Sequence, residues 1–261
     1  MRTRSRHALS GLVAIVLALS LTACGQGATS TATKSGADAS AAAGASKTPG
    51  EMSLKDFAAA MASNQTGQSY HTDMVIDMVA KAGKTSIRAS GDYGPTPAGP
   101  GLRMTMETPM GKIKVIMIGR DFYMLMPFMT DKWQKMDQKS AEEAQAGSDP
   151  EAYVKMLESA SKVEFIGNED VDGQSADHYK VTLPKEAVAK AQGTPLEALK
   201  SISDDIVYDI WLNGAKQPVK MVNKMTMDGQ GLTTTVTFSN YGQEVTIKAP
   251  PANRVVDFKM P

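Results

Sequence analysis

The chain has 261 residues, of which 42% are apolar and 21% are charged, with 28 basic and 28 acidic side chains. This composition excludes a chain that is disordered throughout and a polybasic nucleic-acid-binding protein. The single cysteine excludes an internal disulfide, a multi-cysteine zinc site and an iron–sulfur cluster.

The first 23 residues have the pattern of an export signal. Three arginines precede residues 8–21, which are almost entirely apolar, and the small Ala23 stands directly before Cys24. About 14 apolar residues are too few to span a bilayer as a helix. The pattern resembles the lipobox of bacterial lipoproteins, in which the cysteine sulfur is diacylated and the chain is cut just before it. An ordinary secretory signal with a free thiol beside its cleavage site is the alternative.

Acylation of Cys24 would place the protein outside the cytoplasm, anchored to the outer face of the cell membrane. Two acyl chains contribute about 0.8 kcal/mol per buried CH₂, which is enough for stable anchoring. Without its first 23 residues the chain carries 25 basic and 28 acidic residues, a net charge of −3. This mildly acidic balance argues against electrostatic binding of nucleic acid.

Residues 25–50 consist almost entirely of Ala, Gly, Ser and Thr and cannot form a core. As a flexible coil, a segment of about 26 residues spans on the order of 30 Å. We therefore expect three parts: a signal peptide at 1–23, an acylated Cys24 with a tether at 24–50, and a single folded domain at 51–261.

The folded part opens with a short helix and then changes to the two-residue period of strands. Ser53 is a candidate N-cap, with an apolar stripe from Leu54 to Met61 after it. Alternation at 69–79, 85–93, 102–107, 112–118 and 122–126, with short turns between most of these segments, predicts a five-stranded antiparallel meander. The Gly- and Pro-rich residues 94–101 are expected to form a loop.

The second half mixes both periods. A helix start is expected at Ser148-Asp149-Pro150, helical segments at 185–192 and 195–201, and a helix N-cap at Thr194. Strands are expected at 163–166, 178–183, 206–212, 218–227, 232–239 and 244–248. The fold class is thus α+β, with about ten or eleven strands and a few helices.

Methionine is unusually frequent, and 17 of the 18 lie after the signal. Several are two or four residues apart within one expected strand, which puts them on one face of the sheet. Methionine side chains adapt to irregular apolar partners and are frequent at promiscuous binding surfaces. They also fill gaps in ordinary cores, so the stripes indicate either a closed core or the lining of a cavity.

Sites for catalysis or metal binding find little support. His71 and His178 have no metal-ligand spacing to another His or Cys, and each is expected to be a solvated strand residue. Ser175 lacks the second glycine of a nucleophile elbow. Residues 168–173 match the first half of a calcium loop, but position twelve is Tyr179, so a hairpin turn at 172–173 is the better interpretation. No cofactor, no metal and no enzymatic activity are expected.

The order of several short motifs resembles a known family. They are Gly167-x-Glu-x-Val-x-Gly, His178-Tyr-x-Val, Val207-x-Asp-x-Trp-Leu, Pro218-Val and Tyr241-Gly-x-x-Val-x-Ile-x-x-Pro-Pro. Together with the lipobox they resemble actinobacterial lipoproteins of the LppX/LprG type, which are similar in fold to the LolA and LolB carriers. The resemblance implies a strongly curved antiparallel half-barrel covered by helices, which encloses an apolar cavity for lipid chains.

The resemblance further implies that the protein binds the acyl chains of a lipid or lipoglycan and carries it across the cell envelope, with envelope transport proteins as further partners. A monomer is expected. The alternating apolar faces supply the residues that we expect to line the cavity: Met74, Ile76, Met78, Met104, Met106, Val115, Met117, Met124, Met126, Val181, Met225 and Val236. Residues 94–101 and 126–136 are candidate rim segments, with plain connections as the alternative. A structural or signalling lipoprotein without a bound lipid is the second hypothesis, and an extracellular enzyme is the third.

Overall fold

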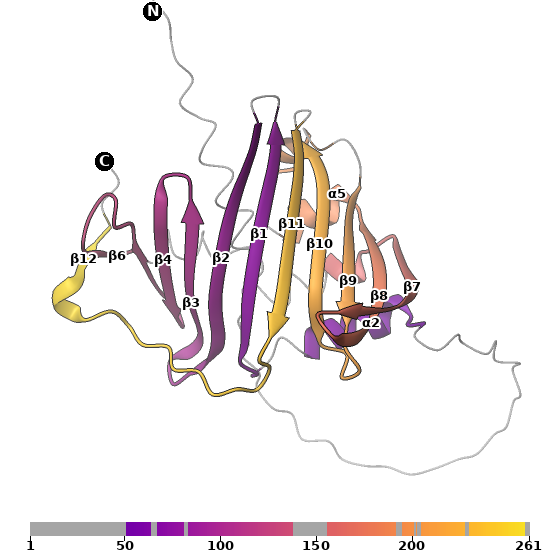
Figure 1. The fold of residues 1–261 in the computed structure, drawn as a ribbon, viewed down its shortest axis with the longest axis horizontal. Coiled ribbons are helices and arrows are strands. Elements are labelled where there is room, and N and C mark those ends of the chain that lie inside the picture. The colour runs from indigo at the N-terminus through magenta and orange to yellow at the C-terminus, as the bar shows by residue number, and fades with distance from the viewer. Residues whose placement is uncertain are drawn as a thin grey trace, which may run out of the picture.

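The computed structural model describes residues 51–258, except 64–66, 81–82, 138–155, 192–194, 201, 203–204 and 228–229. The described residues form one sheet of twelve strands in the order β12-β6-β5-β4-β3-β2-β1-β11-β10-β9-β8-β7 (Figure 1). All neighbours are antiparallel except β12 and β6, which are parallel. The sheet is open, with β12 at one edge and β7 at the other.

The strands are β1 (Tyr70–Ala80), β2 (Gly83–Thr96), β3 (Gly99–Thr108), β4 (Gly111–Ile118), β5 (Asp121–Leu125), β6 (Trp133–Lys135), β7 (Lys162–Val171), β8 (Gln174–Leu183), β9 (Ile206–Leu212), β10 (Pro218–Met227), β11 (Gln230–Ser239) and β12 (Val255–Asp257). The helices are α2 (Leu54–Ser63), α5 (Lys185–Ala191), and the 3₁₀ turns η3 (Leu196–Leu199) and η4 (Ala252–Arg254).

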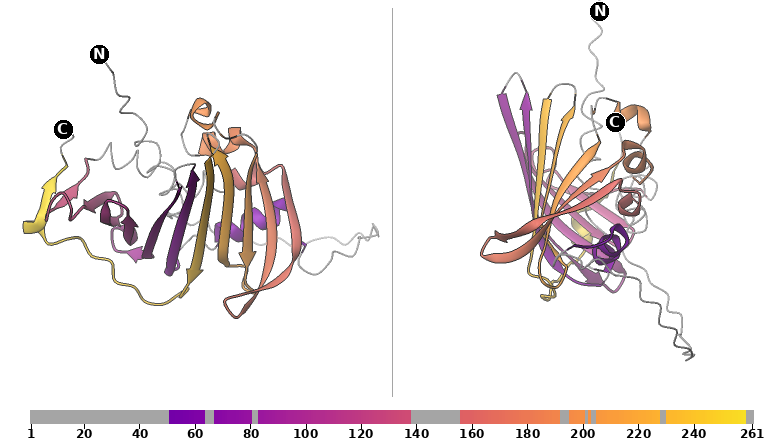
Figure 2. Two further views of the ribbon diagram at one scale, coloured as in Figure 1. Left: turned by 45° about the horizontal axis from the view of Figure 1, so that its top comes forward. Right: turned by 90° about the vertical axis from the view of Figure 1, so that its right-hand side faces the viewer.

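The expected fold class is confirmed. The sheet is curved, and α2, α5 and η3 all lie on its one side (Figure 2). The expected strands at 206–212 and 218–227 match β9 and β10 in both bounds. Twelve strands replace the expected ten or eleven, because the three-residue strands β6 and β12 are too short to show a period.

The helix α2 forms as the sequence predicts. Ser53 Oγ accepts the backbone N–H of Asp56 at 3.1 Å, so the N-cap is confirmed. Phe57, Ala58 and Met61 of its apolar stripe are buried. The expected helix start at 148–150 and the N-cap at Thr194 lie outside the described residues. None of the helices that the structure describes is long and apolar enough to cross a bilayer.

The antiparallel order divides the turns between two ends of the sheet. The β1–β2, β3–β4 and β5–β6 connections, together with the β8–β9 segment that holds α5 and η3, lie at what we call the upper end, as drawn in Figure 1. The β2–β3, β4–β5, β7–β8 and β9–β10 turns lie at the lower end.

Two expectations about local structure are wrong. Residues 94–101 are not a loop: β2 continues to Thr96 and β3 begins at Gly99, so only a two-residue turn remains. Residues 244–248 do not form a strand. In both cases backbone partners, which local composition does not reveal, decide the outcome. The candidate rim segment 126–136 contains the strand β6, and its role as a rim stays a prediction.

Residues 240–254, which we call the C-terminal strap, run past the lower end of the sheet and reach β6 at its far side (Figure 1). Gly94 and Gly101 are paired across β2 and β3 beneath it. A Cβ atom on Gly94 would lie 2.4 Å from Val245, and one on Gly101 would lie 3.2 Å from Ile247. The two glycines therefore make room for the apolar side chains of the strap.

The turn at Asp172 and Gly173 is confirmed. Both residues have positive φ angles, 52° and 81°, in the two-residue connection of the β7–β8 hairpin. The Gly173 N–H donates to Asp170 Oδ1 at 2.9 Å. The oxygen-rich stretch that mimics a calcium loop is thus explained by hairpin geometry.

Candidate functional site

One face of the sheet, which we call the inner face, carries most of the apolar side chains. It is the face on which α2, α5 and η3 pack. Its side chains alternate along each strand, as in β1, where Met74 and Ile76 are buried and Asp73 is exposed. Cross-strand register joins Phe165, Tyr179, Ile210, Met221, Val236, Met74, Ala89, Met106 and Ile113 into one row. The apolar surface thus runs across nine neighbouring strands.

The structure brings together eleven of the twelve residues that we selected from the sequence as cavity lining. Eight of them belong to one buried cluster: Met74, Ile76, Met104, Met106, Val115, Met117, Val181 and Val236. Met78, Met124 and Met225 are partly buried and pack against this cluster. Met126 is not part of it; its carbonyl accepts the N–H groups of Met129 and Thr130 in the turn after β5. Cys24 lies outside the described residues.

Methionine dominates this cluster. Seven methionines belong to its buried part and five more pack against it, so twelve of the 18 in the chain meet here. They are Met61, Met74, Met104, Met106, Met117, Met156 and Met221, and Met52, Met78, Met124, Met136 and Met225. Because the thioether side chain is unbranched and polarisable, such a surface can adapt to apolar partners of different shape.

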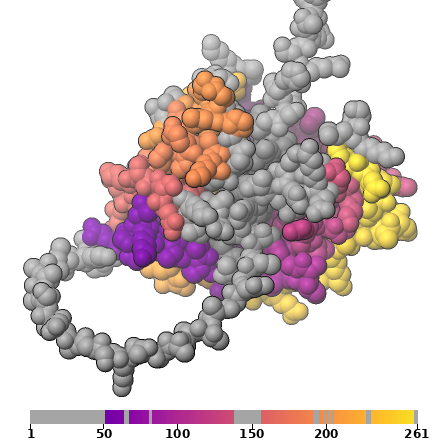
Figure 3. Space-filling model, turned by 180° about the vertical axis from the view of Figure 1, so that it is seen from behind, coloured from indigo at the N-terminus to yellow at the C-terminus, as the bar shows by residue number. Residues whose placement is uncertain are grey.

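Helices cover the half of the inner face that β7–β10 form. Seen from behind, α2 and the α5–η3 region lie next to each other on that half (Figure 3). Phe57 of α2 contacts the ring of Tyr179, with the centroids 5.3 Å apart. Val188 of α5 and Leu199 of η3 are buried in the same cluster.

Sequence reasoning missed several members of the cluster. Tyr179, Ile210 and Met221 are buried in it but were not selected. Tyr179 shares a strand face with the selected Val181, and Met221 shares one with Met225, so the two-residue period could have found both. Helix residues such as Leu199 carry no comparable signal, because their contact with the sheet depends on the tertiary fold.

Four aromatic rings lie together at the lower end. Tyr70 and Tyr93 stack with their centroids 4.9 Å apart, and Phe238 and Tyr241 pack on Tyr70. The Tyr241 hydroxyl donates to the Pro218 carbonyl at 2.6 Å, which joins the strap to the β9–β10 side. Burial raises the pKa of Tyr70 well above its usual value, and none of the described residues forms a hydrogen bond with its hydroxyl. This aromatic cluster lies across the lower end of the inner face.

A recess of about 410 Å³ lies where the chain before α2 meets the edge strand β7. Met52, Val163 and Phe165 form its apolar wall, and each packs against the inner-face cluster. Glu51 and Glu164 line its polar side. This recess is therefore an opening beside the apolar surface at the edge of the sheet.

The opposite, outer face carries charged groups together with His71 and His178. His71 Nδ1 lies 2.7 Å from Asp92 Oδ1, and Arg103 Nη2 donates to Asp92 Oδ2 at 2.6 Å. Burial opposes ionisation of Asp92, but the hydrogen bonds from His71 and Arg103 hold its pKa below the ordinary value. His71 lies on the polar side of β1, as expected, but it is partly buried and held by this network.

His178 corrects the expectation of a solvated strand residue. Its ring stacks on Trp211 with the centroids 4.2 Å apart, and its nitrogens lie 2.9 Å from Glu169 Oε1 and 3.0 Å from Asp209 Oδ1. The Trp211 indole N–H donates to the other Glu169 oxygen at 2.8 Å. Hydrogen bonds from Trp211 and then His178 lower the pKa of Glu169. This network holds β7, β8 and β9 together on the face turned away from the apolar cluster.

The residues described by the structure contain no group of three or more His, Cys, Asp or Glu side chains that could hold a metal ion. The sheet thus has an adaptable apolar surface on its inner face and paired charges on its outer face. Such a surface can remove acyl chains from water without any reaction.

Comparison with known proteins supports the same description of the fold. The crystal structure of lipoprotein LppX from Mycobacterium tuberculosis matches with a TM-score of 0.53, over 75% of this chain and 98% of that chain, at 13% sequence identity. The chain has an LppX-type fold. The structure of LprF from Mycobacterium bovis matches with a TM-score of 0.49, over 76% of this chain and 96% of that chain, at 14% identity.

Two curated proteins of Streptomyces also match the LppX-type chain in sequence. An uncharacterized 31.2 kDa protein of Streptomyces griseus is 31% identical over 121 residues, and a candidate lipoprotein of Streptomyces coelicolor is 31% identical over 110 residues. The matches cover 43% and 42% of this chain, and the chain spans only 40% and 33% of the relatives' own lengths. No family profile matches the chain.

Proposed function

We propose that this protein is an extracytoplasmic lipoprotein, which binds the acyl chains of a lipid or lipoglycan on its inner face and carries it across the cell envelope. The observation that carries the proposal is the single methionine-rich cluster, which extends over one face of an open sheet with an LppX-type fold. Burial of apolar surface contributes roughly 25 cal/mol per Å², so two or three acyl chains provide ample affinity. The residues proposed as lining are the eleven selected from the sequence that belong to this cluster or pack against it, together with Tyr179, Ile210 and Met221.

The proposal is tested by native mass spectrometry of the protein purified from a lipid-containing host, followed by organic extraction and lipid analysis. We expect lipid at near-unit stoichiometry. The double substitution Met104→Trp and Met124→Trp fills the inner face, since both residues lie on one register row with Val115 between them. Bound lipid should then be lost, while the conservative pair Met104→Leu and Met124→Leu should retain it.

A matched control places the same bulk on the outer face. Lys114 and Lys224 are exposed there, so Lys114→Trp with Lys224→Trp should leave lipid binding unchanged. Circular dichroism shows whether each variant is folded. A clean ligand-free mass for the wild type, together with no uptake of a fluorescent acyl probe, would contradict the carrier function.

The anchor is a separate part of the proposal. We propose cleavage before Cys24, diacylation of its sulfur and a flexible tether up to residue 50. The name of the Streptomyces coelicolor relative, a candidate lipoprotein, supports it. Metabolic labelling with palmitate should mark the wild type but not Cys24→Ala. Labelling of the variant at the wild-type level would contradict acylation at this site.

The second candidate function is a structural or signalling lipoprotein without a bound lipid. The close packing of the inner face favours it, because Met74, Met117 and Val236 are only 2–3% exposed. Under this alternative the methionines form a closed core. Uptake of the acyl probe by the purified protein distinguishes the two functions.

A further inference from the structure

The exposed apolar side chains are distributed unevenly between the two ends of the sheet. Among the residues that the structure describes, seven large hydrophobic side chains are exposed, and five of them belong to upper-end segments: Val79, Met110, Phe128, Met129 and Leu196. The other two, Ile166 and Val256, lie in the edge strands β7 and β12. Since exposed apolar side chains that gather in one region mark interaction sites, the upper end is a candidate docking surface.

These residues come from separate segments that project in the same direction. Val79 is next to the β1–β2 turn, Met110 is in the β3–β4 turn, and Phe128 and Met129 follow β5. Met110 and Met129 are 62% and 68% exposed. A Cβ atom on Gly111 would lie 2.9 Å from the Phe128 ring, so this ring packs against the β3–β4 turn. Two of the segments therefore form one continuous apolar tip.

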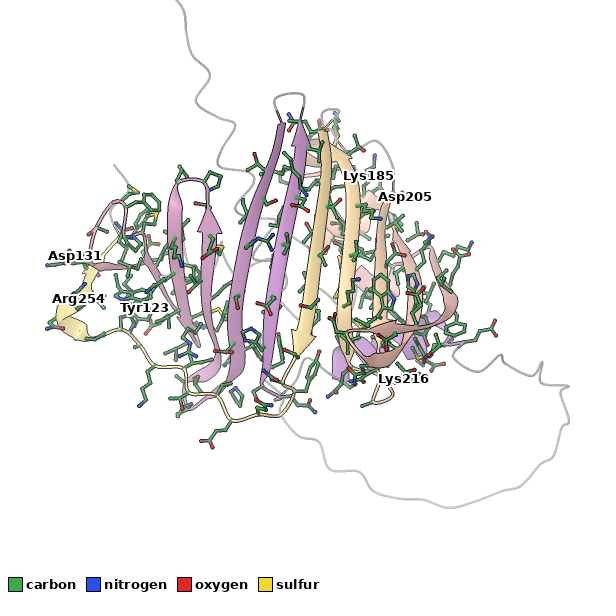
Figure 4. The ribbon with its side chains drawn as sticks, in the orientation of Figure 1. Tyr123, Asp131, Lys185, Asp205, Lys216 and Arg254 are labelled. Carbon is green, nitrogen blue, oxygen red and sulfur yellow. The ribbon has the colours of Figure 1, made fainter. Side chains whose placement is uncertain are left out.

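The lower end has a different character. Its turns contain Arg120, Asp172 and Lys216, and the strap and the aromatic cluster lie beside them. Figure 4 shows Lys216 projecting at this end. The Lys216 ammonium pairs with Asp177 at 2.8 Å. The two ends thus differ in polarity.

The upper end is also continuous with the inner face. Met78, Ile87, Ile113 and Met225 point to that face near the upper ends of their strands, and each is only partly buried. In contrast, Tyr70 and Tyr93 at the lower end are 4% and 3% exposed. An apolar chain that enters from the upper end would therefore meet apolar surface along its whole path.

Charge does not dominate those parts of the upper end that the structure describes. Lys84 pairs with Asp77 at 3.2 Å, Lys112 pairs with Glu107 at 2.9 Å, and Lys200 pairs with Glu197. Lys185 and Asp205 also lie at this end and carry opposite charges (Figure 4). A surface of this kind is suited to partners that are apolar rather than strongly charged.

We propose that the upper end docks on a lipid bilayer, with Met110, Phe128 and Met129 inserted among the lipid headgroups and acyl chains. This inference rests on the proposed function, because it names the membrane as the place where the inner face takes up or releases its ligand. The tether permits this orientation. The proposed tether ends just before α2, and about 26 extended residues reach roughly 90 Å. This exceeds the height of the sheet, since a strand of 14 residues is about 46 Å long, so the upper end can face the membrane.

The test uses the chain without its first 23 residues and with Cys24→Ser, so that neither an acyl anchor nor a native thiol remains. An environment-sensitive fluorophore is attached after Met129→Cys or Met110→Cys at the upper end. The matched positions are Arg120→Cys in the β4–β5 turn and Ile166→Cys in β7. Vesicles of phosphatidylcholine, alone or mixed with phosphatidylglycerol, are then added at low and at high salt.

We expect a blue shift and a rise in fluorescence at positions 129 and 110, no change at 120 and 166, and persistence of the signal in neutral vesicles and at high salt. Replacing Met110 and Met129 together by Gln should weaken vesicle binding by about tenfold or more, because two apolar side chains are lost from the contact. Replacing Ile166 and Val256 together by Gln should leave binding unchanged.

Three outcomes would overturn the inference. No fluorescence response at any position would exclude docking on a bilayer and would leave a protein as the partner of the upper end. Equal responses at 129 and 120 would show non-specific adsorption, and a signal that high salt abolishes would show attraction by charge. Uptake of a soluble acyl probe without vesicle docking would retain the proposed function and reject the docking. Vesicle docking without uptake of the acyl probe would retain the docking and reject the proposed function.

Discussion

Gly91 of β2 lies directly opposite Met104 of β3, and a Cβ atom on Gly91 would be 2.8 Å from the Met104 Cα atom. It would also lie 2.5 Å from the Arg103 carbonyl oxygen. Contacts this short with backbone atoms cannot be relieved by turning a side chain. The backbones of β2 and β3 therefore leave no room for a side chain at position 91, beneath the methionine cluster.

We therefore expect Gly91→Ala to lower the free energy of unfolding by about 1–3 kcal/mol, the usual cost of overpacking. Urea unfolding followed by circular dichroism measures it. The control is Gly231→Ala in β11, where the nearest neighbour of a new Cβ atom is 4.0 Å away. That variant should be neutral or slightly stabilised. Equal losses in the two variants would contradict the role of the Met104 contact.

The packing of α2 on the sheet gives a second prediction. Phe57 is 1% exposed and contacts the Tyr179 ring. We expect Phe57→Ala to cost about 3–5 kcal/mol, because the substitution leaves a cavity in the main cluster. Hydrogen exchange should be accelerated in α2 first. Lys55→Ala on the exposed side of the same helix should change stability little, because alanine favours the helix. A comparable loss there would contradict the role of the Phe57 contact.

The strap gives a third prediction. Ile247 packs with Ile116 and Tyr123 on the outer face. Ile247→Ala should lower the free energy of unfolding by about 2–4 kcal/mol. It should also increase hydrogen exchange at β12 and β6, whose pairing depends on the position of the strap. Lys248→Ala, at an exposed neighbouring position, is the control, and unchanged exchange in Ile247→Ala would show that β12 is held independently.

The outer-face carboxylates predict an acid-sensitive fold. Hydrogen bonds hold the pKa values of Glu169 and Asp92 below the ordinary values of these groups. The folded protein therefore binds fewer protons than the unfolded chain at acidic pH, and its stability decreases as the pH falls through this range. We expect the urea midpoint to fall between about pH 5 and pH 3. The fall should be smaller in Glu169→Gln with Asp92→Asn.

Asp257→Asn, an exposed substitution in β12, serves as the control for this measurement and should retain the wild-type slope. If the double variant also retains that slope, other carboxylates are responsible for the acid sensitivity.

The sequence predicts the strands well wherever one face is buried and the other is solvated. The alternation of Met74 and Ile76 with Asp73 and Asp77 is an example, and it also selected most of the inner-face cluster. The same period failed at residues 244–248. There Val245 and Ile247 alternate as in a strand. Their side chains pack on Gly94 and Gly101, but the segment forms no ladder of backbone hydrogen bonds.

The upper-end tip could not be predicted as such. Phe128 and Met129 look like buried residues in a connection, and only the antiparallel order places them at the same end as Met110. His178 illustrates the opposite case. Its partners Glu169 and Asp209 come from neighbouring strands on each side, and the contact depends on register that a single sequence does not reveal.

The pairing of β1 with β11 has a consequence for the order of folding. Met74 lies opposite Val236, so the middle of the sheet joins segments 162 residues apart, whereas β1–β5 are linked by local hairpins. In a chain that leaves the membrane N-terminus first, this meander can form early, with β1 as an unpaired edge until β11 emerges. An unpaired edge is prone to aggregation. If the protein is exported, as we propose, it should therefore depend on a chaperone or on rapid completion of export during the interval before its last strands arrive.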